Sequence, residues 1–369
     1  MVENKICCIF NYSPHYRKSI YELMDREIGC DFYFGENILG TSIKSLDKKN
    51  LRGFKRCFKN YFCNGKIVWQ SVPLKLVFYS YTHYIFSLDK ACISQIVMMY
   101  LCRLLRKKVF IWTHGWYGNE SMLMGLYKKI IFFPVNGFFL YGNYARQLMT
   151  AEKFSPNKLH VIANSLDYEV QVRLRKNLVH TDIYSKHFGN IHPVVLFIGR
   201  LEPGKKLDKI LNLCYELKSE KPINCVFIGD GVEKPKLERL AKDMAISTSV
   251  WFYGTCYDEV EKSRLIFDAD LCLSPGNVGL TCMDCLAYGT PVITHDNPIM
   301  QMPEFEAISK GRNGDFFMYE NWDDMRNVVK MWLIKHPYKT KELLLSCYEP
   351  IDTVYNPNYQ IDVLKKALS

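Results

Sequence analysis

Short apolar runs alternate along this chain with longer stretches in which apolar residues recur at helical spacing. In the first half, runs predict buried strands at residues 5–10, 74–79, 109–113, 137–141 and 159–163. A helix is expected at 16–24, and Asp89 could cap a longer one that runs to about Leu105. Alternating strands and helices indicate an α/β fold, in which a doubly wound parallel sheet has helices on both faces.

The same alternation is clearer after Pro193. Strands are predicted at 194–198, 224–228, 250–252, 271–273 and 291–294, with helices at 207–218, 233–244, 258–267 and 280–288. Residues 168–190 are polar and weakly patterned. We therefore expect a first domain at 1–175, a linker at 176–190, a second domain at 191–335, and a helical tail at 336–369 that could pack back on the first domain.

The composition fits a folded protein of two domains. The chain has 369 residues, of which 48% are hydrophobic and 23% charged. The first thirty residues do not resemble a signal peptide, and no apolar run approaches the roughly 18 residues of a membrane span. The 14 cysteines are scattered through apolar stretches. This usage favours a reducing, cytoplasmic location.

The net charge of +10 is uneven. Residues 1–189 hold 27 Lys and Arg against 13 Asp and Glu, which gives +14, whereas residues 190–369 hold 21 against 25, which gives −4. The basic, aromatic-rich first half could meet nucleic acid, anionic lipid or phosphorylated substrates.

The segment 44–66 concentrates this positive charge. Leu51, Phe54, Phe58 and Phe62 have helical spacing among cations, which is typical of an amphipathic helix at a membrane interface. Each such cation contributes about 1 kcal/mol near an anionic leaflet. The alternatives are a solvated face whose aromatics pack on the core and, less favoured for want of a recognised motif, a nucleic-acid site. The candidate membrane-binding residues are Lys48, Lys49, Arg52, Lys55, Arg56 and Lys59.

Two short motifs follow predicted strands of the second half. The first is Gly199-Arg200 with Lys205 five residues later, at the carboxyl end of a strand, where open α/β sheets bind ligands. Arginine and lysine together suit a diphosphate, although a solvated basic loop would have the same composition. The second is Gly229-Asp230-Gly231, whose glycines would let the backbone approach a ligand closely.

A third motif spans residues 274–284 and joins a strand to the helix that begins near Gly279. The free amides of a helix start form an anion site suited to a phosphate. Asp284 lies about one and a half turns into this helix. It could accept hydrogen bonds from a ribose, or it could be an ordinary acid on the helix surface.

These motifs, followed by Ala287-Tyr288-Gly289-Thr290-Pro291-Val292-Ile293, resemble the family 4 (group 1) glycosyltransferases of the GT-B fold. The resemblance covers about residues 194–294 and is specific because four motifs occur in order. It extends more loosely to His114-Gly115 and to residues 161–167. It implies two Rossmann-like domains facing across a cleft, a UDP- or GDP-sugar donor bound mostly by the second domain, and retention of anomeric configuration without a metal or cofactor.

The resemblance also implies a role for each matching residue. Arg200 and Lys205 would hold the diphosphate and stabilise the charge that builds on the leaving group, with His114 near the donor sugar as the third catalytic residue. The donor-binding residues would be Gly199, Gly229, Gly231, Gly276, Asn277, Gly279, Leu280, Thr281 and Asp284.

The chain departs from the family pattern in two places. The family has two acids eight positions apart in the third motif, but here Gly276 precedes Asp284. Asn277 could substitute for the missing acid, or the donor could differ. The loop after the first strand lacks the glycine pair of many relatives, and its His15 and Arg17 could meet the acceptor instead.

Two further patterns favour structural roles. Asp268-Ala269-Asp270 imitates the Asp-x-Asp of metal-dependent transferases but falls between a helix end and a buried strand. Cys282 and Cys285 form a single pair on a helix, whereas zinc needs about four ligands. We expect no metal site.

We therefore predict a hexosyltransferase-type enzyme of bacterial surface polysaccharide assembly, such as capsule or lipopolysaccharide. Its acceptor would be a lipid-linked glycan, and the protein would be peripheral on the inner face of the membrane. Gly276 keeps open a catalytically silent nucleotide-sugar-binding subunit. A sugar-nucleotide epimerase is a third reading, which calls for more acid and base residues than the sequence offers.

Overall fold

The computed structural model describes residues 5–36, 44–88 and 92–369. Within these residues the chain forms two compact units. Unit 1 comprises residues 1–167 and 356–369, and unit 2 comprises residues 168–355. Each unit is built on its own parallel β-sheet, so the predicted fold class of two Rossmann-like doubly wound domains is confirmed.

Unit 1 contains a seven-stranded parallel sheet in the order β3-β2-β1-β6-β7-β8-β9, and a separate antiparallel pair β4-β5. Its strands are β1 (Ile6–Phe10), β2 (Cys30–Gly35), β3 (Phe54–Phe58), β4 (Asn60–Cys63), β5 (Lys66–Gln70), β6 (His83–Ser87), β7 (Lys108–Thr113), β8 (Gly137–Leu140) and β9 (Leu159–Val161). Its α-helices are α1 (Lys18–Ile28), α2 (Ile93–Leu104), α3 (Met122–Phe132), α4 (Asn143–Ala151) and α13 (Pro357–Leu368), with short 3₁₀ turns η1 (His15–Arg17), η2 (Lys48–Asn50), η3 (Leu74–Phe78) and η4 (Pro156–Lys158).

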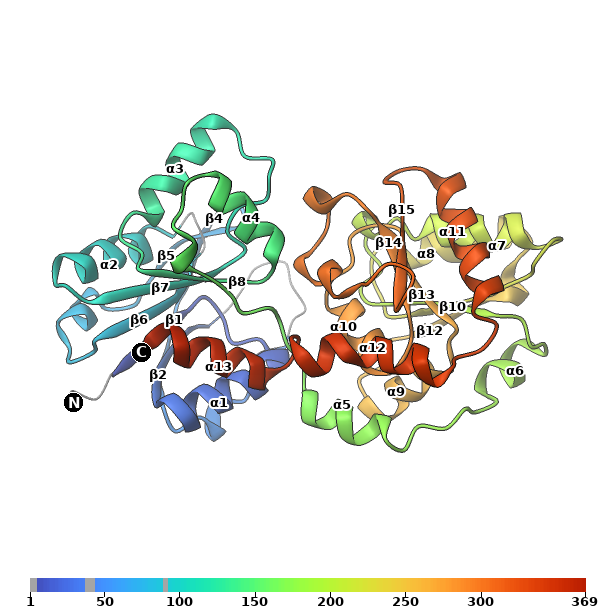
Figure 1. Ribbon diagram of the computed structural model, residues 1–369, viewed down its shortest axis with the longest axis horizontal. Helices are drawn as coiled ribbons and strands as arrows, with labels where there is room; N and C mark the ends of the chain where they lie inside the picture. Colours follow the sequence, from blue (N-terminus) through green and yellow to red (C-terminus); the bar gives the residue numbers. More distant parts are fainter. Residues whose placement is uncertain (1–4, 37–43, 89–91) are drawn as a thin grey trace. The chain divides into compact units, whose positions relative to one another are not determined.

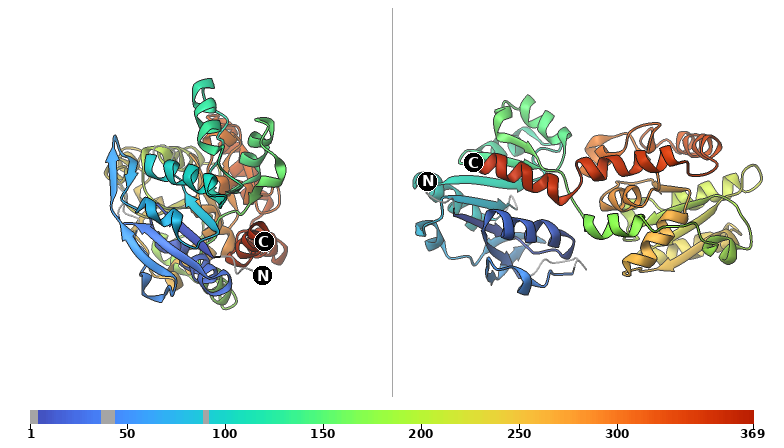
Figure 2. Two further views of the ribbon diagram at one scale, coloured as in Figure 1. Left: turned by 90° about the vertical axis from the view of Figure 1, so that its left-hand side faces the viewer. Right: turned by 60° about the horizontal axis from the view of Figure 1, so that its bottom comes forward.

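Side-chain alternation along β1 divides the core of unit 1 into two layers. Ile6, Cys8 and Phe10 pack on one face with α1 and α13, whereas Cys7 and Ile9 pack on the other with α2 and α3. Figures 1 and 2 show α13, the end of the chain, lying along α1.

Unit 2 contains a six-stranded parallel sheet in the order β12-β11-β10-β13-β14-β15. Its strands are β10 (Val194–Ile198), β11 (Asn224–Ile228), β12 (Val250–Gly254), β13 (Leu271–Ser274), β14 (Val292–His295) and β15 (Gly314–Phe317). Its α-helices are α5 (Tyr168–Arg175), α6 (Ile183–Phe188), α7 (Asp208–Leu217), α8 (Lys234–Asp243), α9 (Glu259–Asp268), α10 (Leu280–Ala287), α11 (Trp322–Lys335) and α12 (Lys341–Thr353), with 3₁₀ turns η5 (Pro203–Lys205), η6 (Ser247–Ser249), η7 (Pro298–Met300) and η8 (Pro303–Ala307). The central strands are buried along their whole length, as strands covered on both faces must be.

The domain boundaries differ from those expected at 175, 191 and 336. The predicted linker, residues 176–190, is part of unit 2, because α6 packs on α9 as α5 does before it. The tail divides at Asn356: α12 stays with unit 2, and α13 belongs to unit 1.

Two predicted elements of the first half are wrong. Residues 74–79 contain the 3₁₀ turn η3, whose Leu76 and Val77 are buried, and the neighbouring strand is β6. Segment 44–66 forms η2, β3 and the β4-β5 pair instead of a helix. The predicted cap Asp89 lies outside the described residues.

The described residues include no helix long and apolar enough to cross a membrane.

Candidate functional site

The candidate site of unit 2 lies where the strand order of its sheet reverses. From β10 the chain proceeds to β11 and β12 on one side, and later to β13, β14 and β15 on the other. Ligands of open α/β sheets bind at such a reversal, outside the carboxyl ends of the strands. Strands β10 and β13 are neighbours here, so the loops that follow them, at 199–205 and 274–279, meet at this edge.

Lys205 joins these two loops. Its Nζ donates to the backbone oxygen of Asn277 at 2.8 Å and to the Asn277 side-chain Oδ1 at 2.6 Å. Burial lowers the pKa of Lys205, while the charges of Glu202 and Glu304 oppose this shift and that of Arg200 adds to it. The structure therefore holds a half-buried ammonium group directly beside the loop that leads into α10.

The start of α10 leaves backbone donors available beside this lysine. Gly279 is the N-cap residue, and it has no side chain with which to cap the helix. On α10, Leu280, Thr281 and Asp284 are half-buried, whereas Cys282, Met283, Cys285 and Leu286 are buried. Amides at a helix start together with a nearby ammonium group form a site for an anion.

Arg200 and Asp284 each have a partner within unit 2. Arg200 is mostly exposed and pairs with Glu202 at 2.7 Å. Asp284 pairs with Lys262 at 3.2 Å and accepts a hydrogen bond from Gln171 Nε2 at 3.2 Å. Burial raises the pKa of Asp284, and Lys262 opposes that shift. The carboxylate is therefore held in a fixed position.

The predicted donor-binding glycines lie where backbones touch. A Cβ on Gly229 would lie 1.9 Å from the carbonyl oxygen of Gly199, and one on Gly231 would lie 2.4 Å from that of Leu201. Gly199 itself faces Thr281, whose hydroxyl donates to the Ile198 oxygen at 2.7 Å. These close approaches leave no room for a side chain at Gly229 or Gly231.

Gly276 is equally confined. Its N–H donates to the Lys205 oxygen at 3.0 Å, and a Cβ would lie 2.1 Å from the Gly204 oxygen and 2.8 Å from Lys205 Cα. The position where the family resemblance implies an acid is thus filled by the backbone of η5.

Two residues that the sequence reasoning missed support the loop 274–279. Gln301 accepts from the Val278 N–H at 2.9 Å and donates to Thr294 Oγ1 at 2.8 Å, which ties the loop to β14. Glu304, in η8, is buried against α10, and its charge favours the ammonium form of Lys205. Both residues follow β14, whose carboxyl end lies at the same edge of the sheet. This position in the sequence could have identified them as part of the site.

A second cluster lies at the carboxyl ends of the strands of unit 1. His114 follows β7, and its ring lies 4.6 Å from the ring of Tyr141, centroid to centroid. Arg17 donates to the Tyr141 hydroxyl, and its guanidinium lies 4.9 Å from the centre of the Trp112 ring. Two of the predicted residues, His114 and Arg17, are therefore brought together, whereas His15 is exposed and hydrogen-bonds the Lys44 oxygen at 3.3 Å.

His114 is neutral at physiological pH. Burial, with Arg17 and Lys128 nearby, lowers its pKa to about 4. Its Nδ1 is buried without a hydrogen-bond partner among the described residues, as is Nε of Arg17. A buried polar atom without a partner is expensive, so both atoms are candidates for contact with a ligand.

The predicted membrane-binding cations do not lie on an α-helix; Lys48 and Lys49 are in η2, and Lys55 and Arg56 are in β3. Lys55 pairs with Asp31 at 3.0 Å, and Arg56 and Lys59 lie over the rings of Phe58 and Tyr61. Lys48 donates to Ser45 Oγ at 2.9 Å. Phe58, on β3, is buried in the core, whereas Tyr61 is exposed.

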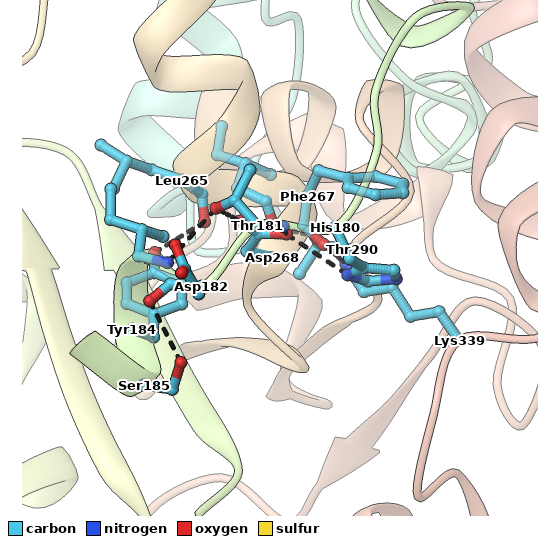
Figure 3. Close-up of polar contacts among 12 residues, drawn as sticks. His180, Thr181, Asp182, Tyr184, Ser185, Leu265, Phe267, Asp268, Thr290 and Lys339 are labelled. Carbon is cyan, nitrogen blue, oxygen red and sulfur yellow. Dashed lines mark hydrogen bonds and ion pairs between the residues drawn. The ribbon is translucent and has the colours of Figure 1, made fainter. Parts of the chain in front are cut away.

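The Asp268-Ala269-Asp270 sequence has the structural role expected of it. Figure 3 shows Asp268 accepting from the N–H of Thr181 and pairing with His180 at 3.3 Å. Asp270 accepts from the Val194 N–H at 2.7 Å. Cys282 and Cys285 are buried in the core.

Comparisons with known proteins agree with this architecture. Residues 185–342 match the model of the family "Glycosyl transferases group 1". A glycosyltransferase from Rickettsia africae has 14% identity and a TM-score of 0.74, with 99% of each chain covered. HepE from Anabaena in complex with UDP has 14% identity and a TM-score of 0.72, with 98% of this chain and 99% of that chain covered. The lipopolysaccharide outer core galactosyltransferase WaaB has 14% identity and a TM-score of 0.69, with 99% of each covered.

No curated protein matches this chain. The solved structures identify the fold as GT-B, and the family match makes residues 185–342 a group 1 glycosyl transferase domain. The family resemblance found in the motifs is therefore confirmed for residues 185–342.

Proposed function

We propose that this glycosyltransferase moves a sugar from a UDP-sugar to a lipid-linked glycan acceptor, with retention of anomeric configuration and without a metal ion. The observation that carries the proposal is the position of the half-buried Lys205 ammonium group, which hydrogen-bonds Asn277 beside the start of α10. The choice of UDP is supported by HepE and by TarM from S. aureus, which were solved in complex with UDP.

Each group of the site has a chemical role in this proposal. The diphosphate lies against the first amides of α10 and the ammonium group of Lys205. As the sugar leaves, negative charge grows on the diphosphate, and fixed positive groups stabilise that charge more than the ground state. Arg200, which is exposed and needs only to leave Glu202, completes the positive environment. Asp284, held by Lys262 and Gln171, accepts from the ribose hydroxyls.

In unit 1, His114 and Arg17 contact the transferred sugar or the acceptor. The neutral ring of His114 can donate or accept a hydrogen bond with a hydroxyl. Its Nδ1, which has no partner among the described residues, supports such a contact. The basic charge of the first half of the chain supports an acceptor that carries phosphate, as a lipid-linked glycan does. Surface polysaccharide assembly is the process we propose, in line with the lipopolysaccharide galactosyltransferase WaaB.

The test replaces Lys205 with Ala and measures release of UDP from a panel of UDP-sugars, with membrane extract as acceptor. We expect turnover to fall by about 100- to 1,000-fold, because a fixed positive group is lost from the leaving-group site. The matched control is Lys218→Ala, which follows α7 and whose Nζ donates to the Ala245 oxygen at 3.2 Å. Thermal unfolding should be similar in both variants. Unchanged turnover, or unfolding of Lys205→Ala alone, would contradict the proposed role.

A second candidate function is nucleotide-sugar binding without turnover. Gly276 favours it, because no side-chain carboxylate can arise from that position. Calorimetry and the UDP-release assay together separate the two candidates. A silent subunit binds UDP-sugars in calorimetry, yet neither wild type nor Lys205→Ala releases UDP with any acceptor.

A further inference from the structure

Helix α3 presents an apolar face that the described residues of unit 1 leave exposed. Its inner side is buried through Ile131 and Phe132. Its outer side exposes Met122, Leu123, Leu126, Tyr127 and Ile130, and Phe133 follows immediately after the helix. Leu123 is 80% exposed and Phe133 is 75% exposed. The exposed positions follow helical spacing, so they form one continuous stripe.

Helix α2 extends this stripe into a wider surface. The hydroxyl of Tyr100 donates to the Ile130 oxygen at 2.6 Å, which places α2 beside α3, as Figure 1 shows. Along α2, Ile93, Val97 and Leu104 are exposed. A hollow of about 980 Å³ adjoins α2. We call this surface the α2–α3 face, and it is lined by the exposed residues of α2 and α3 and by Arg103, Arg106 and Lys108.

The segments that form this face are rich in cations and poor in acids. The sequence holds no Asp or Glu between Asp89 and Glu120, and none between Glu120 and Glu152. Glu120 is buried in a pair with Lys128, and Glu152 pairs with Lys129 at 2.7 Å. Arg103, Arg106 and Lys108 line the hollow next to apolar side chains of α2. Apolar side chains with a cationic rim are complementary to an anionic lipid surface, where acyl chains lie beneath phosphates.

We propose that the α2–α3 face is the membrane-binding surface of this protein and that its partner is an anionic phospholipid bilayer. The stripe of α3 lies in the interface plane, and the cations of the hollow contact lipid phosphates. A second copy of the chain fits less well, because a symmetric pair would place like charges against each other. The inference rests on the proposed lipid-linked acceptor for its purpose, but lipid binding can be measured without sugar transfer.

The experiment is co-sedimentation of the full chain with vesicles of phosphatidylcholine alone or mixed with phosphatidylglycerol. Wild type should bind the mixed vesicles, bind phosphatidylcholine weakly, and lose binding as salt is raised. Two triple variants should each lower the partition coefficient by about tenfold or more: Leu123→Gln with Leu126→Gln and Ile130→Gln, and Arg103→Gln with Arg106→Gln and Lys108→Gln.

Matched controls test whether the loss of vesicle binding is specific to the α2–α3 face. Lys48→Gln with Lys49→Gln and Arg52→Gln removes the same charge from segment 44–66, and Tyr215→Gln with Met331→Gln and Ile334→Gln removes exposed apolar groups from unit 2. Both controls should bind vesicles as wild type does. Equal losses in the controls, or wild-type binding by the face variants, would overturn the proposal.

Two further readouts separate the possible failures. If wild type forms dimers without vesicles and the α3 variant does not, the face is a self-association surface and the proposal is wrong. Release of UDP from UDP-sugars in detergent should persist in the face variants. If vesicle binding behaves as expected and no UDP is ever released, the transfer function fails while the membrane surface stands.

Discussion

Gly276 occupies the position where the family resemblance implies an acid, and its surroundings explain why a side chain is absent. The backbone of η5 lies against its Cα, and its N–H bonds the oxygen of Lys205. The absence of an acid at position 276 and the position of Lys205 therefore have the same structural cause. Glycine here brings Lys205 close to Asn277.

We predict that Gly276→Glu lowers activity instead of restoring a family contact. A Cβ would overlap the Gly204 oxygen, so η5 must move and take Lys205 with it. Affinity for UDP, measured by calorimetry, should fall by about tenfold or more. The matched control is Gly204→Ala, whose new Cβ meets no atom within 4 Å. Tighter UDP binding or faster turnover in Gly276→Glu would show that the loop is not confined as described.

His114 gives a prediction on pH. Its pKa in the folded protein is about 4, below the ordinary value near 6.5, because burial and two cations disfavour the charged ring. The unfolded chain therefore binds a proton more readily. The stability that the neutral ring contributes is present above about pH 6.5 and is lost as the pH falls towards 4.

His114→Phe removes this titration and keeps an aromatic ring against Tyr141. Between about pH 7 and pH 5, wild type should lose more free energy of unfolding in urea than the variant does. His15→Phe, at an exposed ring, is the control and should follow wild type. Equal losses in wild type and His114→Phe would mean that the ring is accessible to water.

The strands of unit 2 could be predicted because they are short, continuous apolar runs that end in glycine or serine, as at 194–198 and 271–274. In unit 1 the same rule failed at 74–79, where Pro73 opens a 3₁₀ turn that buries Leu76 and Val77. The prediction of a helix at residues 44–66 was wrong for another reason. Phe54, Phe58 and Phe62 are four residues apart, and this spacing keeps side chains on one side of either a helix or a strand.

The strand assignment of that segment predicts a large effect at Phe58. Its ring is buried and stacks on Tyr33 at 5.8 Å, so Phe58→Ala should cost about 3 kcal/mol or more of unfolding free energy in urea denaturation. Tyr61→Ala, in the same segment but half exposed, should cost far less. Similar small losses at both positions would favour the surface helix that the spacing first suggested.

Much of the candidate site could also be predicted, since Lys205, Asn277 and Asp284 all follow strand ends within motifs. The supporting residues could not. Gln171 reaches Asp284 from a helix more than one hundred positions earlier in the chain, and Gln301 reaches Val278 from beyond β14. Such contacts depend on how the sheet orders its strands, which no local pattern encodes.

The chain leaves unit 1 after residue 167 and returns to it at Asn356. After unit 2 is complete, the last residues return to unit 1, where Ile361, Leu364 and Leu368 complete the core layer around α1. Gln360 fixes this return by donating to the Ala163 oxygen at 3.1 Å and accepting from the hydroxyl of Ser165 at 2.6 Å. Residues nearly two hundred positions apart in the sequence therefore stabilise unit 1 together.

Leu364→Ala should consequently destabilise unit 1, although the residue follows unit 2 in sequence. The side chain is fully buried, so the cavity should cost about 3 kcal/mol. Hydrogen exchange can assign the loss: amides of β1 and β2 should exchange faster, while those of β10 and β13 keep their protection. Lys365→Ala removes only the surface pair with Glu27 and should change stability by less than about 1 kcal/mol. Faster exchange in β10 and β13 would instead assign the final helix to the stability of unit 2.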